Sequence, residues 1–416
     1  MNSELVISGR AWHRLRPLLV QRDLFAVGSI RRRIAPQVRE LLVDDFQVAG
    51  DLPTGASRPP LDDWCVAVVD QDGTLTPEAL IERLSPKASH LLIVIVLRNS
   101  DHETCQAAAF DQGQISVLDS LRVIGPGMLR LLPSDQPPEL FDAKQDQRWS
   151  RTVGALGVDR FNRLRNSSAT IIGAGRLGSQ TAFQLAALGV GSLRLLDGDT
   201  LLLENLDAMP GLHSTDVGLS KVEALANRLC GFQPELAVTY LEKPLSTSEA
   251  AAFLDRRSDV LISCVDNDTA RLAVSLVARR ALMVHLDVAS SIQRTDNGVE
   301  ISADVRLLFP GEGCVACVGG LDDADRRIYD VAAPAGVLQR GQPRAWHEQR
   351  AGSLITINSI AAGTATQTYL DLFTSGITSS CWHRMAWHAE AGLECHSGRV
   401  DAGDHCRFCR GGESLN

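Results

Sequence analysis

A β-branched run that ends in a glycine-rich turn and leads into an apolar helix limits the fold more than any other feature of this sequence. The run occupies residues 167–172, and the turn that follows reads G-A-G-R-L-G, with Gly173, Gly175 and Gly178 at the spacing G-x-G-x-x-G. An Ala- and Leu-rich stretch at 177–188 then predicts a helix. Glycines in this context let the backbone approach a phosphate, while the helix N-terminus supplies N–H donors. The sequence therefore predicts a nucleotide-binding α/β fold.

Two later apolar runs end in acids, as strands of such a fold would. Residues 191–199, GSLRLLDGD, carry Asp197 and Asp199 at the end of a predicted strand, and residues 258–267, SDVLISCVDN, carry Asp266. Strands that alternate with helices form a parallel sheet, whose ligands bind at the carboxyl ends of the strands. Asp197 follows the glycine turn by about twenty residues, where an acid can bond ribose hydroxyls. The alternative for Asp197 is a solvated turn acid.

The length of the chain predicts two domains, because 416 residues exceed the usual span of one compact core. Residues 1–135 alternate short apolar runs with turn-rich segments and predict a smaller α/β domain. Residues 136–147 are polar and proline-bearing, which predicts a linker, and residues 148–416 hold the glycine turn.

Charge and hydropathy restrict the partners and the compartment. The formal net charge is −9, which offers no basic surface for nucleic acid. The N-terminus has no leader pattern, and no apolar stretch reaches the roughly 18 residues of a membrane span. We expect a cytoplasmic protein that binds neither nucleic acid nor membrane.

Four of the ten cysteines form two C-x-x-C pairs, Cys314 with Cys317 and Cys406 with Cys409. Four thiolates complete a tetrahedral structural zinc site, so the pairs predict one zinc ion that ties the C-terminal tail onto the domain. A redox role for either pair is the alternative, and the neighbouring His405 could replace one thiolate.

Several separated motifs resemble the ThiF/MoeB/HesA family, the bacterial relatives of ubiquitin-activating enzymes. The resemblance covers about residues 146–416. Its motifs are R-W-S-R at 148–151, D-G-D-T-L-L-L-E-N-L at 197–206, G-L-S-K-V-E at 218–223 and C-V-D-N at 264–267, followed by the zinc-knuckle segment FPGEGCVACVGG and the helix segment RAGSLITINSIAAGTATQ.

The resemblance implies a Rossmann-like, mostly parallel sheet that forms an adenylation domain with structural zinc. It implies that ATP and Mg²⁺ activate the C-terminal glycine of a small ubiquitin-like or sulfur-carrier protein, in a bacterial ubiquitin-like pathway that could include a conjugating enzyme. It also implies a homodimer, in which a finger arginine reaches into the partner subunit's site. Carried over by position, the catalytic residues are Arg151 as that finger, Lys221 at the phosphates and Asp266 on magnesium, while Asp197 binds the ribose and Asn205 the phosphates. The expected cofactor-binding set is completed by Gly173, Gly175, Gly178, Asp199 and Lys221, and by Arg176, where the family commonly has glycine.

The chain departs from the family in its phosphate-binding motif. Where the family reads N-L-x-R-Q, this chain has Ala208 in place of the arginine. We hypothesise that Arg176, inside the glycine turn, restores the missing positive charge; a solvated loop arginine is the alternative.

A transthiolating relative also needs a nucleophilic cysteine after the first zinc pair, and residues 318–352 contain none. Cys381 and Cys395, which lie near His383, His388 and His396 in the sequence, could serve instead or be ordinary thiols. Cys264 fits a core position. Adenylation without a thioester on this chain is the simplest expectation.

The N-terminal region supports two interpretations. Residues 107–132 resemble the closing strands of JAB/MPN deubiquitinase-like domains, but the metal-binding H-x-H motif is absent and His13, His90 and His102 are scattered. The region is then a degenerate relative that binds a partner, or a generic α/β recognition module.

Two alternatives to adenylation stay open at this stage. A nicotinamide-dependent oxidoreductase would use the same glycine turn, but it has no place for Lys221 or the zinc pairs. A non-catalytic scaffold that pairs with an active enzyme would explain Ala208.

Overall fold

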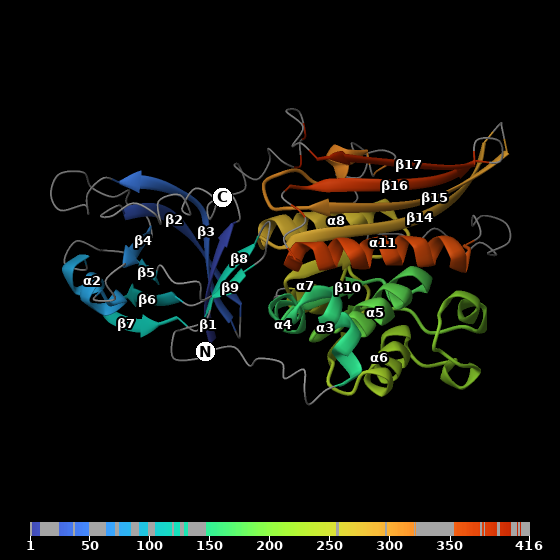
Figure 1. Ribbon diagram of the computed structural model, residues 1–416, viewed down its shortest axis with the longest axis horizontal. Helices are drawn as coiled ribbons and strands as arrows, with labels where there is room; N and C mark the ends of the chain where they lie inside the picture. The colour runs from blue at the N-terminus through green and yellow to red at the C-terminus, as the bar shows by residue number, and fades with distance from the viewer. Residues whose placement is uncertain are drawn as a thin grey trace. The chain divides into compact units, whose positions relative to one another are not determined.

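The computed structural model forms two compact units, Met1–Leu140 and Phe141–Asn416, which are described separately (Figure 1). None of the described helices combines the length and the apolar character that a membrane span requires. The structure describes residues 2–8, 25–35, 38–49, 64–70, 75–84, 91–98, 105–118, 120–124, 129–131, 147–254, 258–295, 298–319, 321, 353–374, 377, 379–388, 392–400, 406 and 408.

The first unit is built on a mixed nine-stranded sheet with the order β7-β6-β5-β4-β2-β3-β1-β8-β9. Its apolar strand β5 is buried on both faces: Ile93 and Ile95 belong to one core, whereas Leu92 and Val94 belong to another that α2 covers. The elements are β1 (Asn2–Ser8), β2 (Phe25–Ala35), β3 (Val38–Ala49), β4 (Trp64–Asp70), α2 (Pro77–Leu84), β5 (Leu92–Arg98), β6 (Cys105–Asp111), β7 (Gln114–Val117), β8 (Ser120–Ile124) and β9 (Leu129–Leu131).

The second unit contains an eight-stranded sheet with the order β12-β11-β10-β13-β14-β15-β16-β17. Its first five strands are parallel, and this confirms the predicted α/β fold with a Rossmann-like, mostly parallel sheet. The strands are β10 (Ser168–Ile172), β11 (Ser192–Leu196), β12 (Ala237–Leu241), β13 (Val260–Ser263), β14 (Val284–Thr295), β15 (Gly298–Leu308), β16 (Cys381–His388) and β17 (Gly392–Arg399).

Helices follow the parallel strands in the alternating order that the sequence predicts. The α-helix α5 begins at Arg176, directly after the glycine turn, and ends at Leu188, where it is capped by Gly189, whose left-handed backbone favours glycine. The helices are η3 (Gln147–Trp149), α3 (Ser150–Leu156), α4 (Val158–Arg165), α5 (Arg176–Leu188), η4 (Leu203–Ala208), η5 (Ser214–Asp216), α6 (Lys221–Phe232), α7 (Ser248–Leu254), α8 (Asp268–Arg280), η6 (Val315–Val318) and α11 (Ile355–Thr374).

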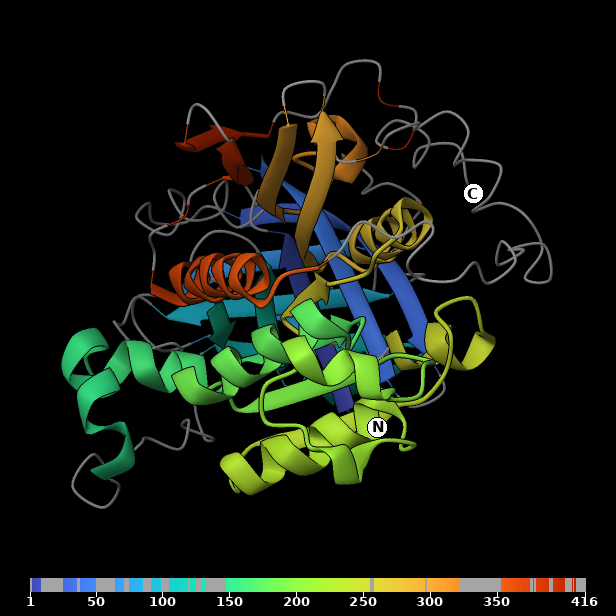
Figure 2. The ribbon, with the colours of Figure 1, turned by 90° about the vertical axis from the view of Figure 1, so that its right-hand side faces the viewer.

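The antiparallel extension β14–β17 is a feature that the sequence analysis did not predict. β14 pairs with β15 along 11 residue positions, and β16 and β17 continue the sheet. The helices α8 and α11 lie on opposite faces of β14 and β15 (Figure 2). Because side chains alternate along a strand, Asp287 faces α8 and Ser290 faces α11, where its hydroxyl bonds Asn358.

Candidate active site

The carboxyl ends of three adjacent parallel strands bring the predicted nucleotide residues to one edge of the sheet. Ile172 of β10 pairs in register with Leu196 of β11 and with Ser263 of β13. The glycine turn, the segment beginning at Asp197 and the turn that carries Asp266 therefore leave the sheet side by side. This is the edge at which ligands of parallel α/β sheets bind.

The glycine turn packs so closely that two of its glycines leave no room for a side chain. A Cβ atom on Gly178 would lie 1.8 Å from the carbonyl oxygen of Gly173, and one on Gly173 would lie 2.7 Å from the carbonyl oxygen of Cys264. Gly173 also has φ of +91°, which L side chains rarely adopt. The turn thus presents bare backbone at the N-terminus of α5, a suitable surface for a phosphate.

Asp197 is held by backbone donors from both sides. One carboxylate oxygen accepts from the N–H of Ala174 at 2.7 Å, and the other accepts from the N–H of Asp199 at 2.8 Å. Burial raises the pKa of Asp197, although Lys221 and the two N–H groups oppose this shift. The carboxylate is therefore fixed in position between the glycine turn and the end of β11.

Lys221 is the first residue of α6, which Ser220 caps by accepting from the N–H of Glu223. Its Nζ atom lies 2.9 Å from a carboxylate oxygen of Asp199, and its own N–H donates to the carbonyl of Asp199. The structure thus brings together two predicted cofactor residues from different segments.

The side chains of Asn205 and Arg176 both bond to other groups of this chain. The side-chain oxygen of Asn205 accepts from the N–H of Leu202 and caps η4. The guanidinium of Arg176 donates to the carbonyls of Glu204 and Ser353 and pairs with Asp207 at 2.8 Å. Arg176 therefore ties the glycine turn to η4 and to the residues that precede α11.

The position of the missing family arginine is part of the packed interior. Ala208 is 1% exposed, and its carbonyl accepts from the Nε2 atom of Gln180. Ser359 of α11 in turn donates to Gln180. A hydrogen-bonded link between α5, η4 and α11 thus runs past Ala208.

Asp266 and Arg151 are exposed residues at the ends of their segments. Asp266 lies in the turn between β13 and α8, where its neighbour Asn267 caps α8 and approaches the Asp266 carboxylate at 3.4 Å. Arg151 lies on α3, a helix with no buried residue. Among the described residues, no hydrogen bond or ion pair connects Arg151 with the other predicted site residues.

Three of the four predicted zinc ligands form a sulfur cluster. The Sγ atom of Cys314 lies 3.8 Å from that of Cys317 and 3.6 Å from that of Cys406, and all three atoms lie within 4.8 Å of one another. Tetrahedral zinc with Zn–S bonds of about 2.3 Å separates its sulfurs by about 3.8 Å, so this geometry fits the ion. Cys409 and His405 lie outside the described residues.

The candidate thioester cysteines occupy the antiparallel strands. Cys381 is half-buried in β16, where burial raises the pKa of its thiol, and its Sγ atom lies 3.9 Å from Nε2 of His383. Cys395 is exposed on β17. Cys264, which directly follows β13, is partly buried, and burial raises the pKa of its thiol to about 12. A raised pKa reduces the thiolate fraction that a nucleophile needs.

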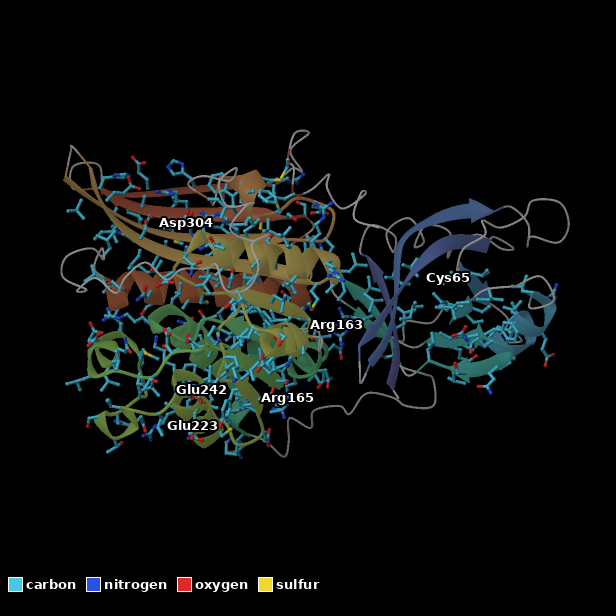
Figure 3. All side chains as sticks on the ribbon, turned by 180° about the vertical axis from the view of Figure 1, so that it is seen from behind. Cys65, Arg163, Arg165, Glu223, Glu242 and Asp304 are labelled. Atoms are coloured by element: carbon cyan, nitrogen blue, oxygen red, sulfur yellow. The ribbon has the colours of Figure 1, made fainter. Side chains whose placement is uncertain are left out.

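A buried polar cluster beside the predicted site was missed by the sequence analysis. Asp287 of β14 is 0% exposed and bonds Ser263 and Arg306, and Arg271 of α8 lies beside it. Figure 3 shows Asp304, which also pairs with Arg306, within the antiparallel strands. The signal in the sequence was an acid inside an apolar strand, because isolated buried charges are rare.

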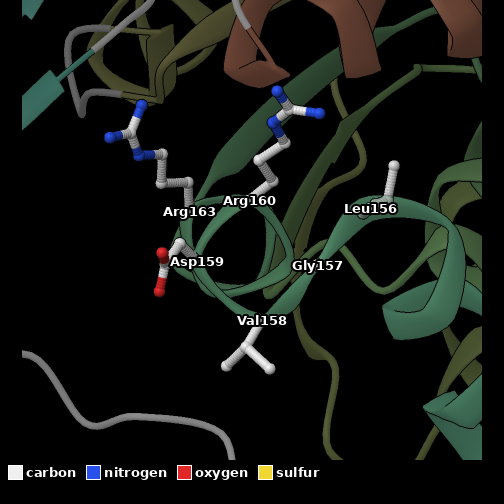
Figure 4. A pocket seen from close by; sticks show the side chains of 6 residues that line it. All are labelled: Leu156, Gly157, Val158, Asp159, Arg160 and Arg163. Atoms are coloured by element: carbon white, nitrogen blue, oxygen red, sulfur yellow. The ribbon is translucent and has the colours of Figure 1, made fainter.

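A separate hollow of about 300 Å³ lies at the turn between α3 and α4 (Figure 4). The side chains of Arg160 and Arg163 extend from α4 on the same side, whereas Asp159 points elsewhere. None of its lining residues belongs to the predicted nucleotide or metal set.

Together, the parallel sheet and the glycine turn define an α/β protein of Rossmann-like architecture. The model of the ThiF family matches residues 149–389, and the chain belongs to this family. The family resemblance inferred from the motifs is thus confirmed.

The similarity to two known relatives extends over part of this chain. It is 29% identical over 218 residues to ubiquitin-like modifier-activating enzyme 5 of Oryza sativa subsp. japonica, a match that spans 48% of this chain and 50% of the relative. The enzyme of the same name from Branchiostoma floridae is 31% identical over 194 residues, with 42% of this chain and 46% of the relative covered. The chain spans about half the length of these curated relatives.

Among solved structures, E. coli MccB has a similar fold. A crystal structure of that protein aligns with a TM-score of 0.50 and 17% identity, covering 66% of this chain and 75% of MccB. At this identity the likeness concerns the fold alone.

Proposed function

We propose that this chain uses ATP and magnesium to adenylate the C-terminal glycine of a small ubiquitin-like or sulfur-carrier protein. The observation that carries the proposal is the meeting of the bare glycine turn, Asp197 and the Lys221–Asp199 pair at one edge of the sheet. Backbone donors, a fixed carboxylate and an ammonium group are the chemistry that a nucleoside triphosphate requires. Membership of the ThiF family favours this reading over a nicotinamide-dependent oxidoreductase.

In this proposal, each residue acts where the structure places it. Asp197 bonds the ribose, and the N–H groups of the glycine turn face the phosphates. Lys221 exchanges its pairing with Asp199 for the phosphates, which carry more negative charge. Asn205 acts on the phosphates from η4, and Asp266, exposed at the end of β13, holds magnesium. When bound, magnesium supplies charge neutralisation at the phosphates.

The reaction itself is a displacement at phosphorus. A carboxylate oxygen of the substrate forms a bond to the α-phosphorus, the bond from that phosphorus to the bridging oxygen breaks, and pyrophosphate leaves. Negative charge accumulates on the phosphate oxygens in the transition state, and preorganised cations and N–H donors stabilise it. Lys221 and the glycine turn provide both kinds of group.

A homodimer belongs to this proposal and gives Arg151 its role as the finger that reaches the partner subunit's site. The helix α3 that carries Arg151 buries none of its residues. An apolar surface lies beside Lys221, where the backbone of Leu201 bonds that of Gly218 and Leu219. Its exposed members are Leu202, Leu203, Val217 and Leu219. We propose that these surfaces contribute to an interface that brings Arg151 to the partner subunit's nucleotide.

The sulfur cluster would hold a structural zinc ion, with Cys409 as the fourth ligand. The cluster packs beside α8, and Arg279 of α8 donates to the carbonyl of Phe408 at 2.8 Å. The zinc would fix the C-terminal tail to the adenylation domain and take no part in the reaction. The first unit would serve to recognise a partner, which could be a conjugating enzyme.

A non-catalytic scaffold is the second candidate, because Ala208 replaces the phosphate-binding arginine and Arg176 is already paired with Asp207. ATP–pyrophosphate exchange separates the two candidates. Purified protein would be assayed with small glycine-ended proteins encoded beside it, together with Asp266→Ala and a control, Glu235→Ala, that removes an exposed acid before β12, at the opposite end of the parallel strands.

Exchange that requires both a protein partner and Asp266, and that Glu235→Ala retains, supports adenylation and identifies the substrate. If the folded, zinc-loaded protein shows no exchange with any partner, the scaffold is the better description.

A further inference from the structure

The turn that carries Asp266 is linked to the buried carboxylate of Asp287. Asp287 lies in the middle of the second unit's sheet, on the strand next to β13, and none of its surface is exposed. Ser263, the last residue of β13, pairs with Asp287 in register, and its hydroxyl donates to Asp287 at 2.7 Å. The residue where the turn begins is therefore fixed by a side-chain bond as well as by the sheet.

The other end of the turn is held by Arg271, in the first part of α8. Its Nε atom lies 3.7 Å from the same oxygen of Asp287 that Ser263 bonds, and its terminal NH2 group approaches the carbonyl of Val265 at 3.4 Å. Val265 directly precedes Asp266. One carboxylate oxygen thus connects the start of the turn, the helix that follows it and, through Arg271, the turn's own backbone.

Asp287 is ionised in this setting. Burial alone would raise its pKa, but Arg271 and Arg306 outweigh burial and lower the pKa. Arg306 on β15 donates to the second oxygen of Asp287 at 2.9 Å. A buried carboxylate that is paired and hydrogen-bonded in this way has a fixed orientation.

Asp266 itself has little that orients its side chain. It is exposed, and the side-chain amide of its neighbour Asn267 approaches its carboxylate at 3.4 Å. The direction of its carboxylate is therefore set by the backbone of the turn. Groups that orient a metal ligand typically change metal affinity by about 10- to 100-fold when they are removed.

We propose that Asp287 is a positioning residue, which through Ser263 and Arg271 fixes the turn that presents Asp266 to the nucleotide-bound metal ion. The inference rests on the proposed function, because it assumes that Asp266 binds the metal. It assigns a task to a carboxylate that has no exposed surface of its own.

Binding of Mn²⁺ tests this inference without relying on turnover. Free Mn²⁺ would be measured by electron paramagnetic resonance in the presence of a non-hydrolysable ATP analogue, for wild type, Ser263→Ala, Arg271→Gln, Arg271→Lys and Asp287→Asn. Asp266→Ala shows the effect of removing the proposed metal-binding carboxylate itself. Arg165→Gln serves as the control, since it removes another arginine–carboxylate pair, with Glu235 on the surface.

We expect Ser263→Ala and Arg271→Gln to weaken Mn²⁺ binding by about 10-fold or more, with metal-free binding of the analogue unchanged. Arg271→Lys, which keeps the charge, should recover part of the loss, and Arg165→Gln should bind as wild type. Asp287→Asn should have the largest effect; if it does not fold, the other variants decide the result.

The inference is overturned if Ser263→Ala and Arg271→Gln lower the melting temperature but leave Mn²⁺ affinity at the wild-type value while Asp266→Ala loses it. A purely structural cluster would give that outcome. If Asp266→Ala binds Mn²⁺ like wild type, the metal role in the proposed function fails, and the inference fails with it.

Discussion

The guanidinium of Arg176 lies 2.8 Å from the carboxylate of Asp207, an acid in the same motif from which the family's arginine is missing. Arg176 also donates to carbonyls of η4 and of the residues before α11. The residue that the sequence suggests as a phosphate ligand therefore has a second task, holding three segments together around the glycine turn.

The Arg176–Asp207 pair predicts that Asp207 and the ATP phosphates compete for the guanidinium of Arg176. If Arg176 binds the phosphates, Asp207→Asn should tighten ATP binding by about 2- to 5-fold at low ionic strength, the scale of an exposed ion pair. Arg176→Ala should weaken binding. Calorimetric titration with ATP measures both, and Glu204→Gln removes an exposed charge from the same helix as a control. Unchanged affinity in Arg176→Ala would leave Arg176 as a structural tie alone.

The buried imidazole of His285 predicts a loss of stability in mild acid. Burial lowers its pKa from 6.5 to about 4, and its Nε2 atom bonds Ser263. Between these pH values the unfolded chain binds a proton that the folded chain excludes, so stability should fall as pH decreases through this window, by roughly 3 kcal/mol at its lower end. Denaturant unfolding at a series of pH values measures the slope.

The matched variant for this experiment is His285→Gln, which keeps a donor near Ser263 and removes the titration. The difference between variant and wild type isolates the contribution of His285 to the pH dependence of stability. The raised pKa of Asp197 changes stability with pH in the opposite direction, and the lowered pKa of Asp287 affects stability only below about pH 4. Equal slopes for the two proteins would contradict the prediction.

The sulfur cluster predicts one zinc ion per chain. Cys314→Ser and Cys406→Ser should abolish the zinc that elemental analysis detects and lower stability by about 2 kcal/mol or more, a shift of at least about 4 °C in Tm for a unit of this size. Cys395→Ser, at an exposed position outside the cluster, should retain zinc and stability. Full zinc content in Cys406→Ser would exclude this cluster as the site.

The proposed dimer predicts complementation between two inactive variants. Arg151→Ala and Lys221→Ala should each lose exchange activity, while an equimolar mixture that has exchanged subunits should recover about a quarter of wild-type activity, because half of the dimers then carry one intact site. Leu203→Glu should shift the protein toward monomer in analytical ultracentrifugation. Recovery would fail if Arg151 acted within its own subunit.

Local patterns predicted the parallel half of the fold well. The run at 167–172, the glycine turn and the helix after it appear as β10, the turn and α5 because each is specified by neighbouring residues. Asp197 and Asp266 could be placed at strand ends for the same reason. The sulfur cluster followed from the chemistry of paired cysteines, although Cys314 and Cys406 are 92 positions apart.

Features that depend on contacts between distant residues could not be predicted from the sequence. The importance of Asp287 comes from Arg306, 19 positions away across β14 and β15, and the partner Ser353 of Arg176 is 177 positions away. No periodicity along one segment records such contacts. Within the antiparallel extension, β15 and β16 border each other only after α11 has returned the chain to the sheet, so their pairing could not be predicted from neighbouring residues.

The approach of Cys406 to Cys314 closes a ring of chain that contains α11, β16 and β17. The entropic cost of closing such a ring grows with the logarithm of its length, by only about 0.6 kcal/mol for each doubling. The entropic cost of the tie between the tail and α8 therefore depends only weakly on how much chain the ring encloses.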